Sequence, residues 1–347
     1  MKLDLDQLLT LSNLNGVPGR EDAVREYVQQ QLGGLVDDLR VDALGNLIAF
    51  RAGRDAPNGK VKERVMLSAH MDEIGFLVRY IDERGFLRLQ PLGGFDPRNL
   101  FARNVTVQTR GGTLPGVLTP GGRPIHISNP EDRSKVPELR AFFVDLGLDA
   151  AAVRQQVRVG DMVTLDQQAR RMGDLVVGKA LDDRASVFMQ LEVLRQLTGP
   201  PRHDLYAVFS TQEEVGLRGA VTAAYSVQPT IGIGLDVTLA VDTPGVEADE
   251  AVTRMGEGIG IKVYDSSMIS TRWLVDEFVD LAEQAGVAYQ LEVLSQGGTD
   301  GAAIQGSRSG VPTLTLSLPT RYIHSVTEAV HVSDLEAGVA LLLAYLK

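Results

Sequence analysis

The chain has 347 residues, 44% hydrophobic and 23% charged, which is the composition of an ordinary soluble globular protein long enough for two domains or for one domain with an insertion. Its net charge of −11 argues against a nucleic acid or an anionic membrane as the main partner. Because cysteine is absent, disulfides, thiolate metal sites and a cysteine nucleophile are excluded, and a metal would have to be held by His and carboxylates. The first six residues lack an apolar signal core, and no apolar run is long enough to span a bilayer, so we expect a cytoplasmic protein.

The first seventy residues alternate helical and strand patterns. Leucines between positions 5 and 14 recur with a helical period, and the turn at 15–19 ends that helix. A second amphipathic helix is expected from about 21 to 35, followed by a hairpin made of 39–41 and 47–50. The apolar run Val65-Met66-Leu67 then predicts a short buried strand.

From about residue 73 to 166 the pattern changes to short β-like runs separated by Gly-rich turns, which is typical of a small β domain. Because segments of α/β character flank it on both sides, we interpret 73–166 as an insertion. The expected strands there are 76–81, 86–89, 105–109, 114–118 and 162–165.

After this segment, strands and helices alternate to the end of the chain. Strands are expected at 175–177, 205–210, 231–235, 258–263 and 311–316, and helices at 183–197, 218–225, 270–285, 301–305 and 333–345. Such alternation predicts an α/β fold with a mostly parallel sheet flanked by helices. In sheets of this kind, sites lie outside the carboxyl ends of the strands.

The strand at 65–67 runs into His70-Met71-Asp72. Alternate side chains of a strand point to the same face, so His70 and Asp72 should lie together. A carboxylate beside an imidazole fixes the tautomer that leaves the other ring nitrogen free for a metal. A polar strand end with a hydrogen-bonded histidine would show the same pattern, so this segment alone does not establish a metal site.

Polar residues recur at the other expected strand ends. They are Asp182 and Asp183 after the strand at 175–177, Glu213 and Glu214 after 205–210, Asp236 after 231–235, and His324 after 311–316. Two imidazoles with hard oxygen ligands suit Zn²⁺, Co²⁺ or Mn²⁺. The carboxylates outnumber what one tetrahedral ion can use, which favours two metals sharing a bridging carboxylate.

Each pair of acids also has an ordinary structural interpretation. Glu213 and Glu214 could be a charge pair before a helix N-terminus. Asp182 and Asp183 could cap a helix, with Arg184 as an ion-pair partner. Since adjacent glutamates cannot easily bind the same ion, one could hold a metal while its neighbour handles a proton.

Six ordered motifs now make the chain similar to a known family. They are S-A-H-M-D-E-I-G, G-K-A-L-D-D-R, Q-E-E-V-G-L-R-G-A, D-V-T with a following D-T-P-G, G-G-T-D and R-Y-I-H-S. Together they resemble the tetrahedral (TET-type) dinuclear metallo-aminopeptidases, which include the glutamyl aminopeptidases and are sometimes labelled endoglucanases. The similarity extends over essentially the whole chain.

The resemblance implies a zinc-exopeptidase-like catalytic domain formed by 1–72 and 167–347, with 73–166 as a β-barrel-like dimerisation domain. It implies a site in which His70 and Asp236 hold one divalent ion, Glu214 and His324 hold a second, and Asp182 bridges them. Zn²⁺ or Co²⁺ is expected, with Mn²⁺ as a third candidate. Glu213 would be the general base for a metal-bridging water, and Asp72 would orient His70.

The same resemblance implies the substrate and the assembly. One metal would take the free amino group of a short peptide, which restricts cleavage to the N-terminal residue. Asp300 and Tyr322 are assigned to substrate contact, and Gly301 stands where a larger small residue such as Ala is expected. Dimers would assemble into a hollow tetrahedral dodecamer. His126, His203 and His331 are expected to be surface or satisfied histidines.

Three other functions remain open at this point. An endoglucanase would need two carboxyl groups facing each other across a sugar bond and usually several aromatic platforms, whereas this chain has one Trp and 5% aromatic residues. A metal-dependent hydrolase of acyl-amino acids would share all the metal residues. A non-enzymatic binder of peptides or metal has no need of Glu213 as a base. The motifs do not indicate the preferred N-terminal residue.

Overall fold

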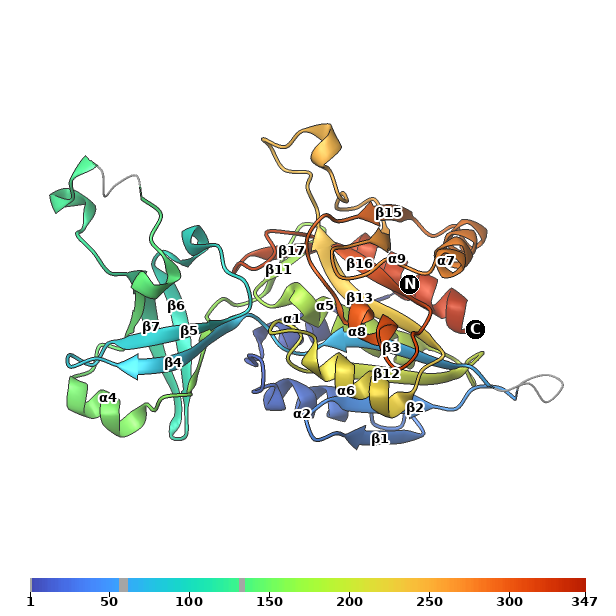
Figure 1. Ribbon diagram of the computed structural model, residues 1–347, viewed down its shortest axis with the longest axis horizontal. Coiled ribbons are helices and arrows are strands. Elements are labelled where there is room, and N and C mark those ends of the chain that lie inside the picture. Colours follow the sequence, from blue (N-terminus) through green and yellow to red (C-terminus); the bar gives the residue numbers. More distant parts are fainter. Residues whose placement is uncertain (1, 56–61, 131–134) are drawn as a thin grey trace.

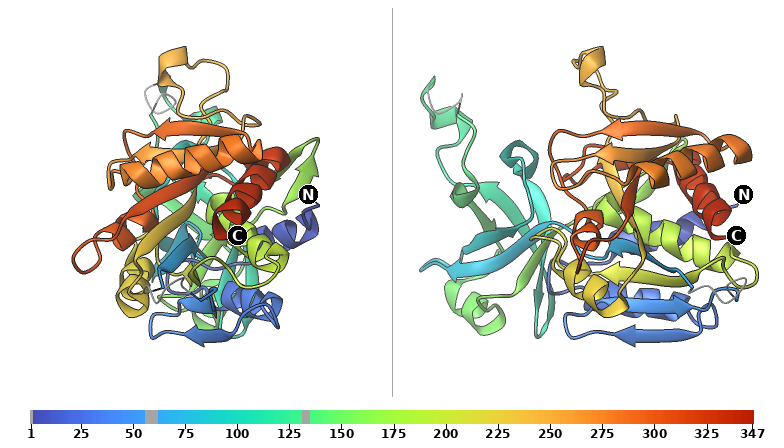
Figure 2. Two further views of the ribbon diagram at one scale, coloured as in Figure 1. Left: turned by 90° about the vertical axis from the view of Figure 1, so that its right-hand side faces the viewer. Right: turned by 45° about the vertical axis from the view of Figure 1, so that its right-hand side comes forward.

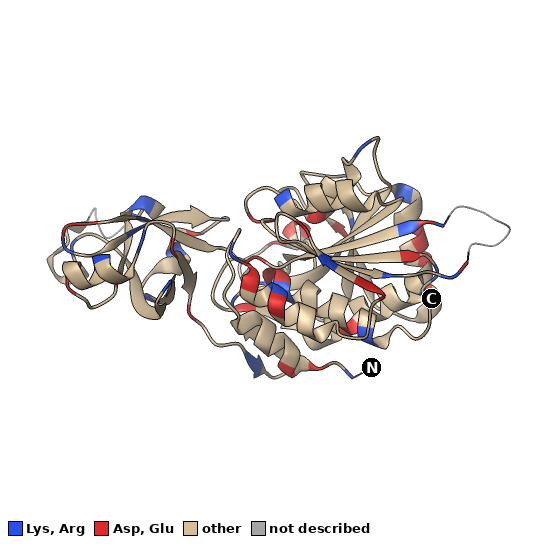
Figure 3. Cartoon of the chain, turned by 90° about the horizontal axis from the view of Figure 1, so that it is seen from below, with Lys and Arg blue, Asp and Glu red and all other residues tan. Residues whose placement is uncertain are grey.

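The computed structural model describes residues 2–55, 62–130 and 135–347. It has two units, a sheet layered between helices and a separate barrel, which lie side by side (Figure 1). Acidic and basic residues are interspersed over both units (Figure 3). Within the described residues, no helix combines the length and the apolar character required to cross a membrane.

The first unit is built on an eleven-stranded sheet, nine of whose strands follow the order β1-β2-β12-β3-β13-β16-β17-β11-β10. The other two, β14 and β15, branch from β16. The strands are β1 (Asp38–Val41), β2 (Leu47–Arg51), β3 (Arg64–His70), β10 (Arg170–Met172), β11 (Leu175–Gly178), β12 (Asp204–Ser210), β13 (Ile231–Leu239), β14 (Ile259–Tyr264), β15 (Tyr289–Val293), β16 (Thr313–Arg321) and β17 (Glu328–His331).

The pairing of these strands corrects the expectation of a mostly parallel sheet. The neighbours β12, β3, β13 and β16 run parallel in the centre, and β14 pairs parallel with β15. The remaining pairs, including β2 with β12 and β16 with β17, are antiparallel. The sheet is therefore mixed, with a parallel centre whose strands all end on the same side.

Helices cover both faces of this sheet, as expected (Figure 2). They are α1 (Leu5–Asn13), α2 (Asp22–Gln31), α5 (Leu181–Gln196), α6 (Arg218–Val227), α7 (Arg272–Ala285), α8 (Asp300–Gln305) and α9 (Val332–Leu346). Successive residues of β3 alternate between two cores: Val65 and Leu67 join the larger core with α5 and α9, while Met66 joins a smaller one with α6 and α8. This two-sided burial explains why the strand reads as an unbroken apolar run.

The second unit is a closed barrel with the strand order β4-β5-β8-β7-β6-β9. Its strands are β4 (Gly75–Ile81), β5 (Leu87–Leu92), β6 (Arg103–Thr109), β7 (Gly112–Pro120), β8 (Phe142–Asp145) and β9 (Met162–Leu165), accompanied by helix α4 (Ala150–Gln156). Alternate residues such as Val105 and Val107 point into its core. Short 3₁₀ helices occur at Pro97–Leu100, Ile125–Ile127, Leu139–Ala141 and, in the first unit, Ala248–Glu250. The prediction of a small β-barrel is confirmed.

A buried ionic cluster fixes the point where the chain passes from the sheet to the barrel. Glu73 accepts hydrogen bonds from Lys179 Nζ at 2.7 and 2.8 Å and from the backbone N–H of Gly16 at 3.0 Å. Arg184, fully buried, donates to the backbone oxygens of Met71 and three N-terminal residues. Paired in this way, the buried charges hold the His70–Glu73 segment firmly against α5.

Candidate metal centre

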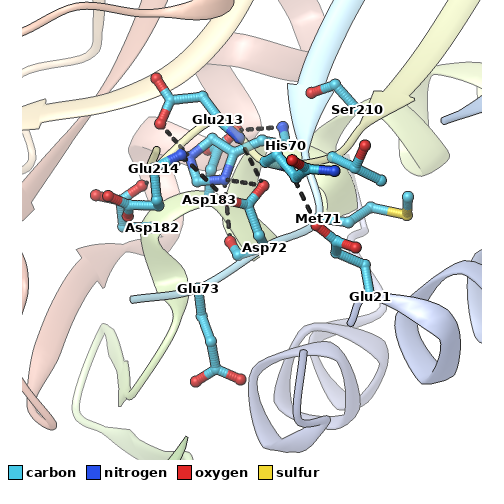
Figure 4. Close-up of polar contacts among 12 residues, drawn as sticks. Glu21, His70, Met71, Asp72, Glu73, Asp182, Asp183, Ser210, Glu213 and Glu214 are labelled. Carbon is cyan, nitrogen blue, oxygen red and sulfur yellow. Dashed lines mark hydrogen bonds and ion pairs between the residues drawn. The ribbon is translucent and has the colours of Figure 1, made fainter. Parts of the chain in front are cut away.

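Two histidines and several acids from separate segments meet at the carboxyl ends of the parallel strands. His70 ends β3, Asp182 lies at the start of α5, Glu213 and Glu214 follow β12, Asp236 belongs to β13, and His324 follows β16. Figure 4 shows His70 and Asp182 beside Glu213 and Glu214. One position differs from the expectation: β13 continues to Leu239, so Asp236 lies within the strand rather than at its end.

The carboxylate of Asp182 lies between the two imidazoles. Its Oδ1 is 3.1 Å from His70 Nε2, and its Oδ2 is 3.3 Å from His324 Nε2. His324 Nε2 is also 3.3 Å from Glu214 Oε1, and Glu213 Oε2 lies 3.9 Å from His70 Nε2. Each oxygen of Asp182 therefore faces a different histidine.

The acids and histidines perturb one another strongly. Burial raises the pKa of Asp236, Glu213 and Glu214, and neighbouring carboxylates raise it further. Burial favours neutral imidazoles, yet the charge of Glu213 and the bond to Asp182 raise the pKa of His70 well above its ordinary value.

His324 and Asp182 show the same competition in the sharpest form. Burial opposes protonation of His324, but its bonds to Asp182 and Glu214 raise its pKa to about 12. Burial alone would raise the pKa of Asp182. The hydrogen bonds from His324 and His70 together have the larger effect and lower its pKa. The carboxylates of the cluster thus favour positive charge at both imidazoles.

The donor set fits two divalent cations. Ligand atoms of His70, Asp182 and Asp236 lie within 4.8 Å of one another, and so do those of Asp182, Glu214 and His324. Asp182 belongs to both sets, as a bridging carboxylate must. Oε1 of Glu214 is buried and contacts His324 Nε2 at 3.3 Å without meeting hydrogen-bond geometry, which suits an atom that binds a cation beside that imidazole. Imidazole nitrogens with carboxylate oxygens are ligands for Zn²⁺, Co²⁺ or Mn²⁺.

Asp72 contacts the site in two ways. Its backbone oxygen lies 3.0 Å from His70 Nδ1, closer than its Oδ1 at 3.6 Å, so the main chain holds the ring more closely than the side chain does. Its carboxylate instead accepts the backbone N–H groups of Glu213 at 3.0 Å and Glu214 at 3.1 Å. Asp72 therefore couples the position of His70 to that of both glutamates.

Glu21, which the sequence did not single out, extends this support (Figure 4). The residue is buried, and its Oε1 accepts the N–H of Gln212 at 3.0 Å and that of Gly19 at 2.7 Å. Glu21 and Asp72 together receive three consecutive N–H groups, those of residues 212–214. Burial and the nearby Asp72 charge raise the pKa of Glu21 to about 7.

Two more buried acids support the ligands. Glu328 accepts the N–H of Asp182 at 3.0 Å and that of His324 at 2.8 Å, and burial together with the Asp182 charge raises its pKa to about 8. Asp183 accepts the N–H of His70 at 3.2 Å. The sequence analysis identified Asp183 through the adjacent pair Asp182-Asp183. It did not identify Glu328, which lies in no recognisable motif.

The barrel also reaches the centre. A Cβ placed on Gly93 would lie 3.0 Å from Glu214 Oε2 and 2.4 Å from Ile74 Cγ2, and its φ of 86° favours glycine. A Cβ on the next residue, Gly94, would lie 3.3 Å from His324 Nδ1. The turn after β5 therefore packs against two of the candidate ligands.

Asp300 and Tyr322, the residues expected to contact substrate, differ in exposure. Asp300 is buried, and its Oδ2 accepts the hydroxyls of Ser68 at 2.6 Å and Ser210 at 2.5 Å. Tyr322 is 54% exposed. Within the described part of the chain, neither residue lines the cavity beside the centre. Asp300 therefore supports β3 and β12 through their serine hydroxyls, and the assignment of both residues to substrate contact stays a prediction. A Cβ on Gly301 would lie 2.5 Å from Thr315 Oγ1, so glycine fits the local packing.

Of the three remaining histidines, His126 and His331 are surface or satisfied residues, as expected, whereas His203 is half-buried. His331 Nδ1 accepts the N–H of Ser333 at 3.1 Å at the start of α9. His203 lies near the ring of Tyr345, and His126 is exposed in a 3₁₀ helix.

A cavity of about 510 Å³ opens beside the centre. It begins at Asp182, Glu213, Glu214, Asp236 and His324, and it continues between the end of β13, Lys262 of β14 and the loop at 296–299. The candidate ligands thus form one end of a recess deep enough for a side chain.

Comparisons with known proteins agree with this arrangement. The M42 glutamyl aminopeptidase family matches residues 45–341. A putative aminopeptidase of Acetivibrio thermocellus is 36% identical over 97% of this chain and 96% of its own. A lysyl aminopeptidase of Pyrococcus furiosus is 33% identical (96% and 93%), and a glutamyl aminopeptidase of Lactococcus lactis is 30% identical (95% and 92%).

Solved structures give the same result. An aminopeptidase of Desulfurococcus kamchatkensis matches with a TM-score of 0.91 and 37% identity, covering 98% of this chain and 93% of that one. The TET1 peptidase of Pyrococcus horikoshii, described as assembling into a tetrahedron or an octahedral shell, matches at 0.83 with 30% identity over 98% of both. A Thermotoga maritima protein labelled endoglucanase matches at 0.79 with 30% identity over 98% and 96%. This chain belongs to the M42 glutamyl aminopeptidase family and is an aminopeptidase.

Proposed function

We propose that the protein is a dinuclear metal-dependent aminopeptidase that removes N-terminal residues from short peptides. The observation that supports this most directly is the sharing of Asp182 by two sets of three ligands, with Glu213 beside them. We assign His70 and Asp236 to one ion, Glu214 and His324 to the other, and the bridge to Asp182.

Two cations held there would polarise the scissile carbonyl, lower the pKa of a shared water and anchor the free amino group of the substrate. The protein itself moves the proton. Glu213 accepts it from the attacking water at a carboxylate oxygen and delivers it to the leaving amine. Asp72 holds Glu213 and Glu214 at their backbone nitrogens and His70 at its ring nitrogen.

The alternatives are weaker on this geometry. An endoglucanase site needs two carboxyl groups separated across a sugar bond, whereas these acids converge within a few ångströms on two imidazoles. A hydrolase of acyl-amino acids would use the same residues, so the substrate panel below includes acylated amides. The metals proposed are Zn²⁺ or Co²⁺, with Mn²⁺ as the third candidate.

We also propose that the chain forms a homo-oligomer through an insertion domain comprising 73–166, with 1–72 and 167–347 as the catalytic domain. The TET1 peptidase from Pyrococcus horikoshii, which assembles into a tetrahedron or a large octahedral shell, supports this. The barrel strands span Gly75 to Leu165, close to the proposed boundaries. By the same comparison, dimers are proposed to assemble into a tetrahedral dodecamer. We place this assembly in the cytoplasm as a separate part of the proposal.

The experiment that tests the activity uses protein stripped with a chelator and reloaded with Zn²⁺, Co²⁺ or Mn²⁺. It is assayed with aminoacyl-nitroanilides, short peptides, N-acetylated versions of both and a β-glucan. We expect metal-dependent release only from free N-termini. Cleavage of the acetylated compounds or the glucan, with none of the free-amino substrates, would overturn the proposed substrate, and full activity of the stripped protein would overturn the metal requirement.

The loop that carries Glu213 gives a separate prediction. Glu21→Ala removes the acceptor of the Gln212 N–H, and a lost buried hydrogen bond of about 1–2 kcal/mol should lower kcat roughly tenfold with KM and metal content nearly unchanged. Glu21→Gln, which keeps an acceptor oxygen, should restore most of kcat. Equal loss in both variants, or a loss of bound metal, would contradict a role in positioning Glu213.

A further inference from the structure

The cavity that opens from the metal centre has walls of two kinds. Beyond the candidate ligands it is lined by the apolar side chains of Leu217, Val237, Leu239, Leu294 and Ile323, together with the uncharged residues Thr238, Gln296, Gly297, Gly298 and Thr299. Lys262 is the only Lys or Arg among its described lining residues. If the proposed function holds, the side chain of the substrate's N-terminal residue enters this cavity, because its amino group and scissile bond lie at the metals.

Lys262 is already engaged by the protein. Its Nζ is 2.6 Å from Glu292 Oε1, and the hydroxyl of Thr238 donates to the same oxygen at 2.5 Å. Asp265 Oδ2 lies 3.8 Å from the ammonium on its other side. Lys262 and Glu292 are 0% exposed and Asp265 is 1% exposed. The register of β14 with β15 pairs residues 262 and 292 directly, so the backbone maintains this ion pair.

The cluster offers no unpaired positive charge that could bind a negatively charged substrate side chain. Two carboxylates, Glu292 and Asp265, surround one ammonium, and Glu292 Oε2 and Asp265 Oδ2 lack hydrogen-bond partners in the described structure. A substrate carboxylate would lose its water against apolar walls, and Lys262, the one Lys or Arg among the described lining residues, is already paired with Glu292. A substrate ammonium would meet Lys262 first, since Glu292 and Asp265 do not line the cavity.

We propose that this pocket selects uncharged N-terminal residues of aliphatic or thioether type, and that the Lys262–Glu292 pair excludes both acidic and basic ones. The inference rests on the proposed aminopeptidase function and adds its specificity. Overall similarity does not decide it, because relatives at 30% and 33% identity are named glutamyl and lysyl aminopeptidases. The inferred preference for uncharged side chains rests instead on the charge balance at Lys262.

The first test is a comparison of nitroanilides of Leu, Met, Glu and Lys with the metal-loaded full chain. We expect kcat/KM for Leu and Met to exceed the values for Glu and Lys by roughly tenfold or more, the scale of burying an uncompensated charge. Binding of the free amino acids, followed as a shift in the unfolding temperature, should rank leucine above glutamate and lysine. A value for Glu or Lys equal to or above that for Leu would overturn the inference.

The second test changes the charge balance without changing the shape. Glu292→Gln keeps an acceptor for Thr238 and Lys262 but removes one negative charge. The ratio of kcat/KM for Glu over Leu should rise about tenfold, and that for Lys over Leu should fall. The matched control is Glu26→Gln, a change at an exposed residue of α2, which should leave both ratios unaltered. An unchanged Glu/Leu ratio in a folded Glu292→Gln protein would overturn the role of the pair.

The experiments distinguish a failure of the aminopeptidase function from a failure of the proposed pocket specificity. If no free-amino substrate is cut with any metal, the aminopeptidase function is wrong. If such substrates are cut with a preference for a charged residue, the function stands and the assignment of the pocket is wrong. Should Glu292→Gln fail to fold, the wild-type panel alone decides.

Discussion

Glu213→Gln is expected to lower kcat by about 10²–10⁴-fold while both metal ions remain bound. The amide has nearly the shape of the carboxylate but cannot accept a proton from the attacking water. The loop should keep its position because it is held through the backbone N–H groups at 212–214, which the substitution leaves in place. The measurement is kcat at saturating substrate together with the metal content of the same preparation.

Glu214→Gln is the informative comparison for this variant. Its Oε1 lies 3.3 Å from His324 Nε2, within one of the two ligand sets, so this change should reduce bound metal rather than proton transfer alone. The general-base assignment would be wrong if the Glu213 variant retained substantial kcat with both metals present. A loss of metal in the Glu213 variant would instead make that residue a ligand.

Asp182→Asn is expected to lower the affinity of both metal positions and so to abolish activity. Its two oxygens face His70 and His324 at 3.1 and 3.3 Å, and it is shared by the set that contains His70 and Asp236 and the set that contains Glu214 and His324. An amide offers one weaker oxygen ligand in place of a charged bridge. Metal content after dialysis should fall below two ions per chain, even where the unfolding temperature of the metal-free protein is unchanged.

Asp280→Asn serves as the control, since Asp280 is an exposed residue of α7. It should retain the metal content and the activity of the parent protein. If Asp182→Asn still bound two ions with the parent's affinity, the bridge would have to be sought elsewhere in the cluster. Loss of a single ion would place Asp182 on one metal only.

The parts of the fold that the sequence predicts are those determined by local pattern. The apolar residues of α5 and α9 and the buried runs of β3 and β12 are short-range signals, and the structure contains these elements within a few residues of the expected limits. β15 and β17 were not recognised. Because their pairing depends on β14 and β16, partners distant in the chain, local pattern could not show that the sheet is mixed.

The same distinction applies to the site. Five of the candidate residues lie in compact motifs and could therefore be predicted from the sequence: His70, Asp182, Glu213, Glu214 and His324. Glu21 and Glu328 act through hydrogen bonds to residues 191 and 146 positions away, and neither lies in a motif that indicates such a partner. Asp236 was found, but its place inside β13 depends on how far that strand pairs with β16.

The contact of Gly93 and Gly94 with Glu214 and His324 has a consequence for how this protein can change. The barrel and the sheet unit cannot be exchanged between relatives as independent modules, because the turn after β5 packs against two candidate ligands. A chimaera that joins the barrel of one homologue to the sheet of another must carry the matching turn. Substitution in the barrel is correspondingly restricted at this turn by its packing against Glu214 and His324.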